Sequence, residues 1–589
     1  MGRTISIGAQ SFEFIRKNNY FFIDKTGFIK EWWENGDAVT LITRPRRFGK
    51  TLNLDMMNSF FSNTYEGRGE LFEGLSIWED KSPDGENPLS GDYKYRKLQG
   101  SYPVIFLSFA GIKGQTFEET KQGIKYTLAK LYESHEYLRN GKGMGKREQN
   151  FFDSVSPEMT DGVAVLALKY LSDYLEAYYG QKVLIFLDEY DTPLQEAYVY
   201  GYWNEMAGFI RSMFNSAFKT NPSMERAIMT GITRISKESI FSDLNNLTVV
   251  TTTSERYCAQ FGFTEEEVFQ ALDQMGMSEC KEDVRQWYDG FTFGSQRDVY
   301  NPWSITNFMK ERELKPYWAN SSANRLVNLL IRQGNARTKT IMEDLMKGGF
   351  LETEIDEEII FDQLREKPGA IWSMLLASGY LKVAQKRFSR ETRRFTYRLK
   401  LTNWEVEMMF EDMIRGWFGG EDVPYNDFIK ALLLGNVKAM NRYMNKVALA
   451  TFSYFDTGKR PSDEIEPERF YHGFVLGLMV ELAGRYRVTS NWESGFGRYD
   501  VMLEPCKRED PAFVLEFKVH DPEDEDTLED TVQEALRQIK DKGYDSELIA
   551  RGIPEGRIRH LGFAFEGKRV LIGQSGTLIP LKASLINNV

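Results

Sequence analysis

Five short apolar runs in the first half of the chain constrain the fold more than any other feature of the sequence. They occupy residues 38–43, 103–109, 183–188, 227–232 and 249–253. Helical patterns separate them. A strand that is apolar on both faces belongs in a sheet covered by helices on both sides, so the runs predict a parallel sheet of the α/β class.

Length and composition bound the remaining possibilities. A chain of 589 residues is too long to fold around one hydrophobic core, so several domains are expected. Its composition, with 27% charged and 42% hydrophobic residues, excludes a disordered or fibrous protein. The three cysteines, Cys258, Cys280 and Cys506, lie far apart, which excludes a disulfide framework and a CxxC zinc site and favours the cytoplasm. No apolar stretch reaches the roughly 20 residues that span a bilayer, so no membrane is expected.

A candidate phosphate loop follows the first apolar run. Residues 44–51 read RPRRFGKT and precede a helical pattern at 52–61. This is GxxxxGK[ST] with Arg44 at the first glycine. In such a loop Gly49 lets the backbone approach phosphate, Lys50 reaches the β- and γ-phosphates, and Thr51 binds Mg²⁺ at the helix N-terminus. The alternative is an ordinary basic turn before a helix.

An acidic motif at the end of another apolar run supports the interpretation of a phosphate loop. The apolar run at 183–188 ends in Asp188, which Glu189 follows. In a P-loop ATPase such an Asp holds Mg²⁺ and a following Glu polarises the attacking water. A buried strand that simply ends at solvent is the alternative. Both motifs, in this order on one predicted sheet, favour ATP and Mg²⁺ binding, and predict an ATPase.

The loop and further segments resemble the predicted AAA-ATPase-like family, a bacterial P-loop group whose loop also reads RPRRFGK[ST]. The matching segments are residues 20–26 (YFFIDKT), 187–191 (LDEYD), 230–246, 287–291 (WYDGF) and 300–303 (YNPW). The resemblance spans residues 5–320 and implies an ATPase core followed by a helical lid.

The resemblance also assigns residues to the nucleotide site. It places Arg46, Arg47 and Phe48 in the nucleotide-binding loop. It further implies that Thr230 and Arg234, at the end of a strand, sense the γ-phosphate. A salt bridge between Arg234 and an acid is the alternative.

A D…ExK pattern near the C-terminus predicts a second site. Asp500 precedes Glu516 and Lys518, and period-2 alternation puts the last two on one face of a strand, with Phe517 on the other. If the strands pair, Asp500 joins Glu516, and two carboxylates bind Mg²⁺. Lys518 then activates a water for attack on a phosphodiester. A solvated Glu–Lys pair is the alternative.

This region, residues 465–575, resembles the PD-(D/E)XK nuclease superfamily. The supporting segments are 470–473, 490–500 and 534–544, the last of which contains Gln538, on the expected helix. A helical glutamate that the superfamily often adds is Glu468 rather than Glu481. The alternative interpretation of Glu468 is an acid at the start of a helix, where the helix dipole favours negative charge. Seven acids between Asp521 and Asp530 are interpreted as a solvated loop before a helix.

A basic ribbon predicts where nucleic acid binds. Residues 382–400 carry eight Lys or Arg against one acid, in a chain whose net charge is −12. Phe388, Phe395 and Tyr397 lie among them, after a helix at 371–381. Such a ribbon is typical of a winged helix that holds phosphates. The alternative is a solvated hairpin.

These features predict four parts: 1–260, a P-loop AAA-ATPase-like domain; 261–402, a lid and winged-helix-like region; 403–464, a helical linker; and 465–589, a PD-(D/E)XK nuclease-like domain. The predicted function is ATP-dependent cleavage of nucleic acid, DNA before RNA. The competing hypothesis is a nucleotide-dependent switch or defence scaffold whose nuclease-like domain binds without cutting. Related P-loop proteins often form homo-oligomers, and a homo-oligomer is possible here, but the sequence does not indicate the oligomeric state.

Overall fold

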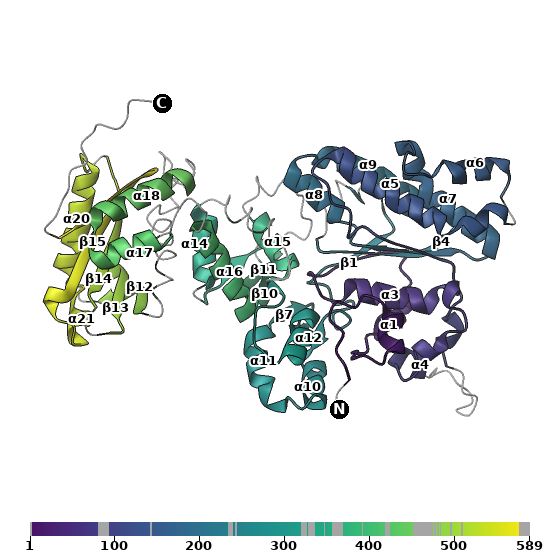
Figure 1. Ribbon diagram of the computed structural model, residues 1–589, viewed down its shortest axis with the longest axis horizontal. Coiled ribbons are helices and arrows are strands. Elements are labelled where there is room, and N and C mark those ends of the chain that lie inside the picture. Colours follow the sequence, from purple (N-terminus) through teal and green to yellow (C-terminus); the bar gives the residue numbers. More distant parts are fainter. Residues whose placement is uncertain are drawn as a thin grey trace. The chain divides into compact units, whose positions relative to one another are not determined.

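Figure 1 shows the computed structural model of the chain. It describes residues 3–80, 93–141, 144–233, 240–241, 244–319, 327, 331, 336–346, 348–355, 369–390, 393–418, 425–451, 475, 479, 482, 485–494, 497–507, 510–522 and 524–575. The chain forms two compact units. One comprises Met1–Leu326 with Phe350–Met408, and the other Val327–Gly349 with Met409–Val589.

The first unit contains a parallel five-stranded sheet of spatial order β2-β3-β4-β1-β5. Its strands are β1 (Val39–Thr43), β2 (Val104–Ser108), β3 (Val183–Asp188), β4 (Met224–Gly231) and β5 (Leu247–Val250). They coincide with the five apolar runs and confirm the predicted α/β class. Because β4 lies between β1 and β3, the ends of these three strands meet at one edge of the sheet.

Helices cover both faces of this sheet (Figure 1). One face carries α1 (Phe12–Lys17), α2 (Gly27–Asn35), α3 (Lys50–Phe61) and α4 (Ser76–Glu79); the other carries α5 (Phe117–Glu133), α6 (Lys146–Ser154), α7 (Asp161–Tyr179), α8 (Thr192–Tyr200) and α9 (Trp203–Phe214). Trp32 and Phe60 pack with Ile42 and Phe186 in the core on the α3 side. The burial of large aromatic rings here fixes α3, and with it the loop that precedes it.

The segment from Phe263 to Glu311, which belongs to the predicted lid region, combines helices with a small antiparallel sheet, β6-β8-β7. Its elements are β6 (Phe263–Thr264), α10 (Glu265–Gln274), α11 (Lys281–Tyr288), β7 (Phe291–Phe293), β8 (Gln296–Tyr300) and α12 (Pro302–Glu311). A capping box between Thr264 and Glu267 starts α10. Strands β7 and β8 form an antiparallel hairpin after α11.

A helix and a ribbon follow in the same unit. Helix α15 (Ala370–Ala377) precedes the antiparallel pair β10 (Leu381–Ser389) and β11 (Arg394–Leu401), and β9 (Leu351–Thr353) pairs with β11. The predicted helix and ribbon are thus present, with a third strand that the sequence did not indicate. Helix α16 (Trp404–Phe418) begins directly after them.

The second unit contains a mixed sheet of order β12-β13-β14-β15-β16. The strands are β12 (Tyr486–Ser494), β13 (Gly497–Pro505), β14 (Ala512–Val519), β15 (Ile558–Glu566) and β16 (Arg569–Gln574), with only β14 and β15 parallel among neighbours. The helices are α14 (Ala336–Met346), α17 (Tyr425–Leu434), α18 (Val437–Thr451), α20 (Leu528–Lys542) and α21 (Ser546–Ala550). Strand β12 was not predicted.

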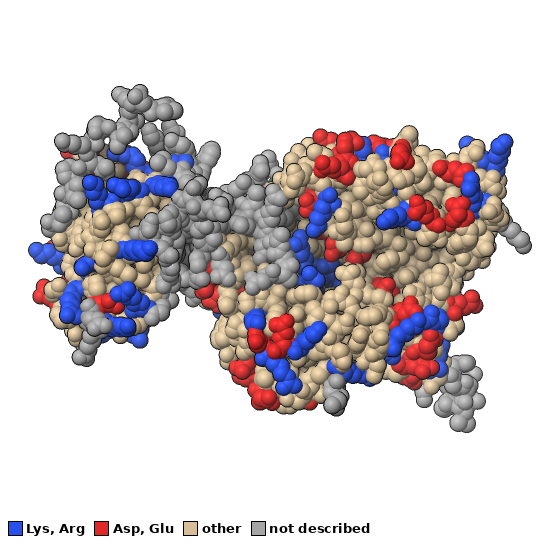
Figure 2. Space-filling view, viewed as in Figure 1, with Lys and Arg blue, Asp and Glu red and all other residues tan. Residues whose placement is uncertain are grey.

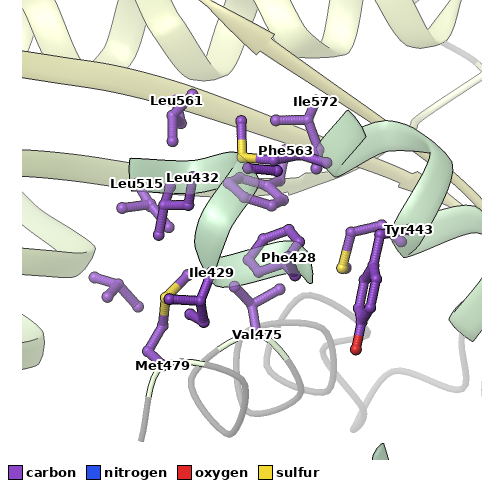
Figure 3. Close-up of a cluster of buried hydrophobic side chains, with 14 of the residues drawn as sticks. Phe428, Ile429, Leu432, Tyr443, Val475, Met479, Leu515, Leu561, Phe563 and Ile572 are labelled. Carbon is purple, nitrogen blue, oxygen red and sulfur yellow. The ribbon is translucent and has the colours of Figure 1, made fainter. Parts of the chain in front are cut away.

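The two faces of this sheet have separate cores. Figure 3 shows Phe428 and Leu432 of α17 packed with Leu515 and Phe563 of the sheet. On the other face, Val514 packs with residues of α20 and α21. Helices α17 and α18, from the predicted linker 403–464, therefore share a core with the C-terminal sheet; the four-part division itself stays a prediction.

Two amides of α18 cover the free edge of β16. Asn441 exchanges two hydrogen bonds of 2.8 Å with the backbone of Ile572. Asn445 does the same with Val570, at 2.6 and 3.1 Å. Side chains one helical turn apart thus take the place of a further strand.

No helix in the described part of the chain is long and apolar enough to cross a membrane.

Candidate active sites

The candidate phosphate loop joins β1 to α3. Gly49 ends the loop with φ +80°, and no atom lies within 4 Å of where its Cβ would be. Only glycine takes this backbone conformation without strain. Helix α3 begins at Lys50. Its free N–H groups therefore lie at the loop, as in sites that bind phosphate.

Lys50 is buried inside this loop. Its ammonium donates to the carbonyl oxygens of Arg44 and Pro45, at 3.0 and 2.9 Å. Burial lowers the pKa of Lys50, and the carboxylates of Glu189 and Asp188 oppose that shift. Two main-chain carbonyls thus fix the position of the cation next to the acidic strand.

Asp188 links the loop helix to the central strand of the sheet. The hydroxyl of Thr51 donates to one carboxylate oxygen at 2.7 Å, and that of Thr230 donates to the other at 2.6 Å. Asp188 is buried, which raises its pKa, while both hydroxyl contacts oppose the shift. The structure therefore brings together Thr51, Asp188 and Thr230, which the sequence places far apart.

Glu189 follows Asp188 in a left-handed conformation, φ +50°. Its N–H donates to the Thr230 hydroxyl at 3.4 Å, and its carboxylate accepts from Thr192 at 3.1 Å. A non-glycine residue with positive φ is a local strain that is common at functional sites. The turn places Glu189 directly beyond Asp188.

Asp191 has a role that the sequence analysis did not assign. One of its oxygens accepts from the N–H groups of Ile232 and Thr233 and from the Thr233 hydroxyl, each at 3.0 Å. Asp191 therefore holds the chain after β4, where Arg234 follows. Arg234 itself lies outside the described residues.

The side chain of Arg44, the residue in place of the first glycine, points away from the loop. Its guanidinium donates to the carbonyls of Thr43 and Thr251, at 2.9 and 2.8 Å, and lies 4.7 Å from the ring centre of Phe293. Complete burial lowers the pKa of Arg44 to about 10. These contacts of Arg44 stabilise the loop from the side of the sheet. They explain how an arginine can stand where the general P-loop pattern has its first glycine.

Arg46 and Arg47 of the loop contact the predicted lid region. Figure 1 places β7 and α12 beside the loop end of β1 and α3. The carbonyl of Arg46 accepts from the side chains of Asn301 and Trp318, at 3.3 and 3.0 Å. Arg47 lies 4.1 Å above the ring of Trp303. The loop conformation is thus coupled to the lid.

Phe48 is turned inward. It is buried, and its ring packs edge-to-face on Phe291 and Phe293, with centroids 4.7 and 5.3 Å apart. Arg46 and Arg47 are exposed, so their side chains remain accessible to a nucleotide. The role in nucleotide binding predicted for all three stays a prediction.

Another sequence motif, YFFIDKT, anchors the lid. The buried ammonium of Lys25 contacts both carboxylate oxygens of Glu267 at 2.7 Å, and donates to the carbonyl of Ala259 at 2.8 Å. Asp24 accepts from the N–H and hydroxyl of Thr26 at 2.8 and 2.6 Å. The motif therefore fastens α10 to the ATPase-like core.

The second site lies on the α20 face of the C-terminal sheet. Val501 pairs with Leu515, so Asp500 lies opposite Glu516 on the neighbouring strand. Glu516 is buried, and the amide of Gln538 on α20 donates to it. The structure thus brings Asp500, Glu516 and Gln538 together, and Lys518 shares the face of Glu516.

The fit of this site to a divalent cation rests on two carboxylates. The N–H of Phe517 donates to Asp500 at 2.8 Å. Across the described ranges, no group of three or more His, Cys, Asp or Glu side chains could hold a metal ion. Asp500 and Glu516 supply oxygen ligands of the kind Mg²⁺ takes with water. Glu468, the predicted addition, lies outside the described residues.

The acidic segment after β14 is only partly solvated. Glu525 accepts from the Thr531 hydroxyl at 2.5 Å and lies 3.4 Å from His520. The side chains of Glu525 and His520 are mostly buried, and Thr527 with Asp530 forms the capping box of α20. No local sequence pattern indicates the contact of His520 with Glu525, because the contact depends on how α20 packs.

The charge of −12 is distributed unevenly over the surface. On the face of the second unit that Figure 2 shows, blue Lys and Arg side chains predominate, notably over α18. Acidic and basic side chains alternate over the first unit. Overall charge therefore does not exclude local contact with nucleic acid.

Comparisons with known proteins match two regions of the chain. Residues 6–241 match the family model "Predicted AAA-ATPase", and residues 466–575 match "PD-(D/E)XK nuclease superfamily". An "Uncharacterized protein in vnfD 5'region" of Azotobacter chroococcum mcd 1 is 25% identical over 575 residues, which cover 96% of each chain. The chain therefore combines an AAA-ATPase-like domain with a domain of the PD-(D/E)XK nuclease superfamily.

Proposed function

We propose that this protein binds and hydrolyses ATP, and that it couples this activity to metal-dependent cleavage of nucleic acid, with DNA as the substrate. The contact of Asp188 with both Thr51 and Thr230 carries the ATPase part of the proposal. A carboxylate at this position contacts both the start of α3, which follows the phosphate loop, and the neighbouring strand β4.

In the nucleotide half, Lys50 and the N-terminus of α3 hold the β- and γ-phosphates. Thr51 and Asp188 would hold Mg²⁺, which would supply positive charge beside the phosphates. Glu189 orients the attacking water, and Thr230 with Arg234 responds to the γ-phosphate. The contacts of Arg46 with Asn301 and Trp318 carry the state of the loop to the lid.

In the nuclease half, Asp500 and Glu516 hold the cation. A divalent cation supplies Lewis-acid polarisation of the phosphodiester and neutralises its charge. Lys518 orients and deprotonates the attacking water, and Gln538 fixes the carboxylate of Glu516 through its amide. Glu468 is the helical acid proposed to complete the site.

Nucleic acid is proposed to contact the ribbon at 382–400 and the C-terminal domain. Arg390, Arg393 and Arg394 are exposed. Reversing these three to Glu is expected to weaken DNA binding and to reduce the dependence of affinity on salt concentration, because fewer counterions are released. Unchanged affinity and salt slope in a filter-binding titration would contradict a role for the ribbon.

One observation favours the competing function, a nucleotide-dependent switch whose nuclease-like domain binds without cutting. Both acids of the site already have partners within the chain: Asp500 accepts from a backbone N–H, and Glu516 from Gln538. A cation must share these carboxylates with those donors.

One experiment separates the two functions. Supercoiled plasmid, linear duplex, single-stranded DNA and RNA are incubated with the full chain, with Mg²⁺ or Mn²⁺, with and without ATP. Lys50→Ala is expected to abolish ATP turnover, and Lys518→Ala to abolish cleavage while ATP turnover persists. Equal cleavage by wild type and Lys518→Ala would refute the nuclease assignment, and ATP turnover without any cleavage would favour the switch.

A further inference from the structure

The outer half of the β10–β11 ribbon carries an exposed pair of phenylalanines. Phe388 lies opposite Phe395 in the strand register, and their ring centroids are 5.0 Å apart. The two residues are 51% and 46% exposed. Two adjacent rings left in water on a narrow ribbon indicate a binding surface rather than a core.

The pair belongs to one face of the ribbon, which we call the aromatic face and define by Lys386, Phe388, Phe395 and Tyr397. Alternation along each strand and the pairing of Lys386 with Tyr397 put these four side chains on the same side. The Lys386 ammonium lies 4.5 Å from the ring centre of Phe395. The face therefore combines flat apolar rings with a cation.

The opposite face is partly neutralised by acids. Arg394 contacts Glu354 at 2.8 Å, and Arg398 contacts Glu352 of β9 at 3.0 Å. Among the ion pairs of the described residues, none involves Lys386. A polyanion that approaches the ribbon therefore meets less repulsion on the aromatic face.

Two further arginines extend the positive charge beyond the rings. Arg390 and Arg393 are exposed at the outer end of the ribbon, and neither is ion-paired in the part of the chain that the structure describes. The phosphates next to bases stacked on the two rings would therefore lie near these cations at the outer end of the ribbon.

We propose that the aromatic face of the ribbon binds single-stranded nucleic acid by stacking bases on Phe388 and Phe395, with Lys386 near the phosphates. The inference deepens the proposed function and rests on it. Every base has a flat face that can stack on an aromatic ring, and single strands leave these faces free. In an undistorted duplex the neighbouring base pairs already cover them.

A binding experiment with the full chain tests this proposal. Fluorescence anisotropy is measured in EDTA, which prevents metal-dependent cleavage, with a labelled single-stranded DNA, its duplex, and an abasic strand of equal length. Wild type is expected to bind the single strand more tightly than the abasic strand or the duplex. The abasic strand keeps the phosphates, so the difference isolates stacking.

The variants locate the effect on the ribbon. Phe388→Ala with Phe395→Ala is expected to weaken single-strand binding by about tenfold or more, and to leave the abasic strand unchanged. Phe388→Tyr with Phe395→Tyr keeps the rings and is expected to restore affinity. Phe14→Ala removes a ring that is 47% exposed on α1, and serves as the matched control.

The outcomes distinguish this inference from the proposed function. If the wild type binds nucleic acid but the alanine pair loses affinity equally for ordinary and abasic strands, the stacking inference fails alone. Tighter binding of the duplex that depends on the two rings would instead indicate a wedge between base pairs and overturn the single-strand preference. Absence of binding to all three ligands would overturn both proposals.

Discussion

At the scale of single residues, the hydroxyl of Thr230 on β4 donates to the buried carboxylate of Asp188 at the end of β3. Thr230→Val keeps the shape of the side chain but leaves a buried Asp188 oxygen without the hydroxyl that donates to it at 2.6 Å. We expect a loss of about 1–3 kcal/mol in the free energy of unfolding, and reduced ATP turnover. Urea denaturation and a phosphate-release assay measure these effects.

The neighbouring strand offers a matched control for that substitution. Thr40 is buried in β1, and its hydroxyl forms no hydrogen bond among the described residues. Thr40→Val is therefore expected to leave stability and turnover unchanged or to raise stability. Equal losses in the two variants would show that the Thr230 hydroxyl has no special contact with Asp188.

Glu405 makes stability depend on pH. It is buried at the start of α16, where it accepts from the Trp318 N–H at 2.6 Å and from the Ser304 hydroxyl at 2.9 Å, and burial raises its pKa to about 7 from 4.5. Between these two pKa values the folded state binds the extra proton. The free energy of unfolding should therefore fall as pH rises from 4.5 to 7, by about 3 kcal/mol.

The variant Glu405→Gln isolates this contribution. It cannot ionise, so the difference in unfolding free energy between wild type and variant should change between pH 5 and pH 8, in favour of the variant at pH 8. Urea titrations at both pH values measure it. A difference that is the same at both would contradict the raised pKa of Glu405.

At the scale of elements, Gly290 of the WYDGF motif, directly before β7, packs closely against the backbone that follows β11. Gly290 has φ +129°, and a Cβ there would lie 2.1 Å from the carbonyl oxygen of Thr402. Gly290→Ala should cost several kcal/mol, because a backbone atom cannot move aside. Thermal unfolding of the full chain measures the loss.

Gly276 provides the comparison, because it has φ +67° but no atom within 4 Å of a Cβ position. Gly276→Ala carries only the backbone strain, about 1 kcal/mol. Similar losses for Gly276→Ala and Gly290→Ala would mean that the approach to Thr402 is looser than described.

The elements also show what sequence can predict and why the rest escapes it. Strands β1 and β3 were the most predictable, because burial at every position makes each a largely apolar run. Strand β12 mixes polar and apolar residues, and β6 and β7 are too short for periodicity to show. Alternation predicted the shared face of Glu516 and Lys518. By contrast, the contacts of Arg44 and His520 depend on distant segments that no local pattern reveals.

At the scale of the whole molecule, ligand binding should protect one unit selectively. Binding to the folded state alone stabilises the part that forms the site. Mg²⁺ and ATP are therefore expected to slow amide hydrogen exchange in β1, α3 and β4, and to leave β14 unchanged. Exchange measured by mass spectrometry tests this.

The Lys50→Ala variant is the control for that measurement. It should show no protection on addition of ATP, because the cation that meets the phosphates is missing. Protection of β1 and α3 that persists in Lys50→Ala would place the nucleotide elsewhere in the chain.

The asparagines of α18 limit how copies of the sheet can associate. Their amides occupy the outward backbone groups of Val570 and Ile572 on β16. An incoming strand therefore finds these backbone groups already paired, and among the described strands β12 forms the other edge of the sheet. Pairing of two copies through their β12 edges alone would give a closed pair of molecules, not a fibre that grows edge to edge.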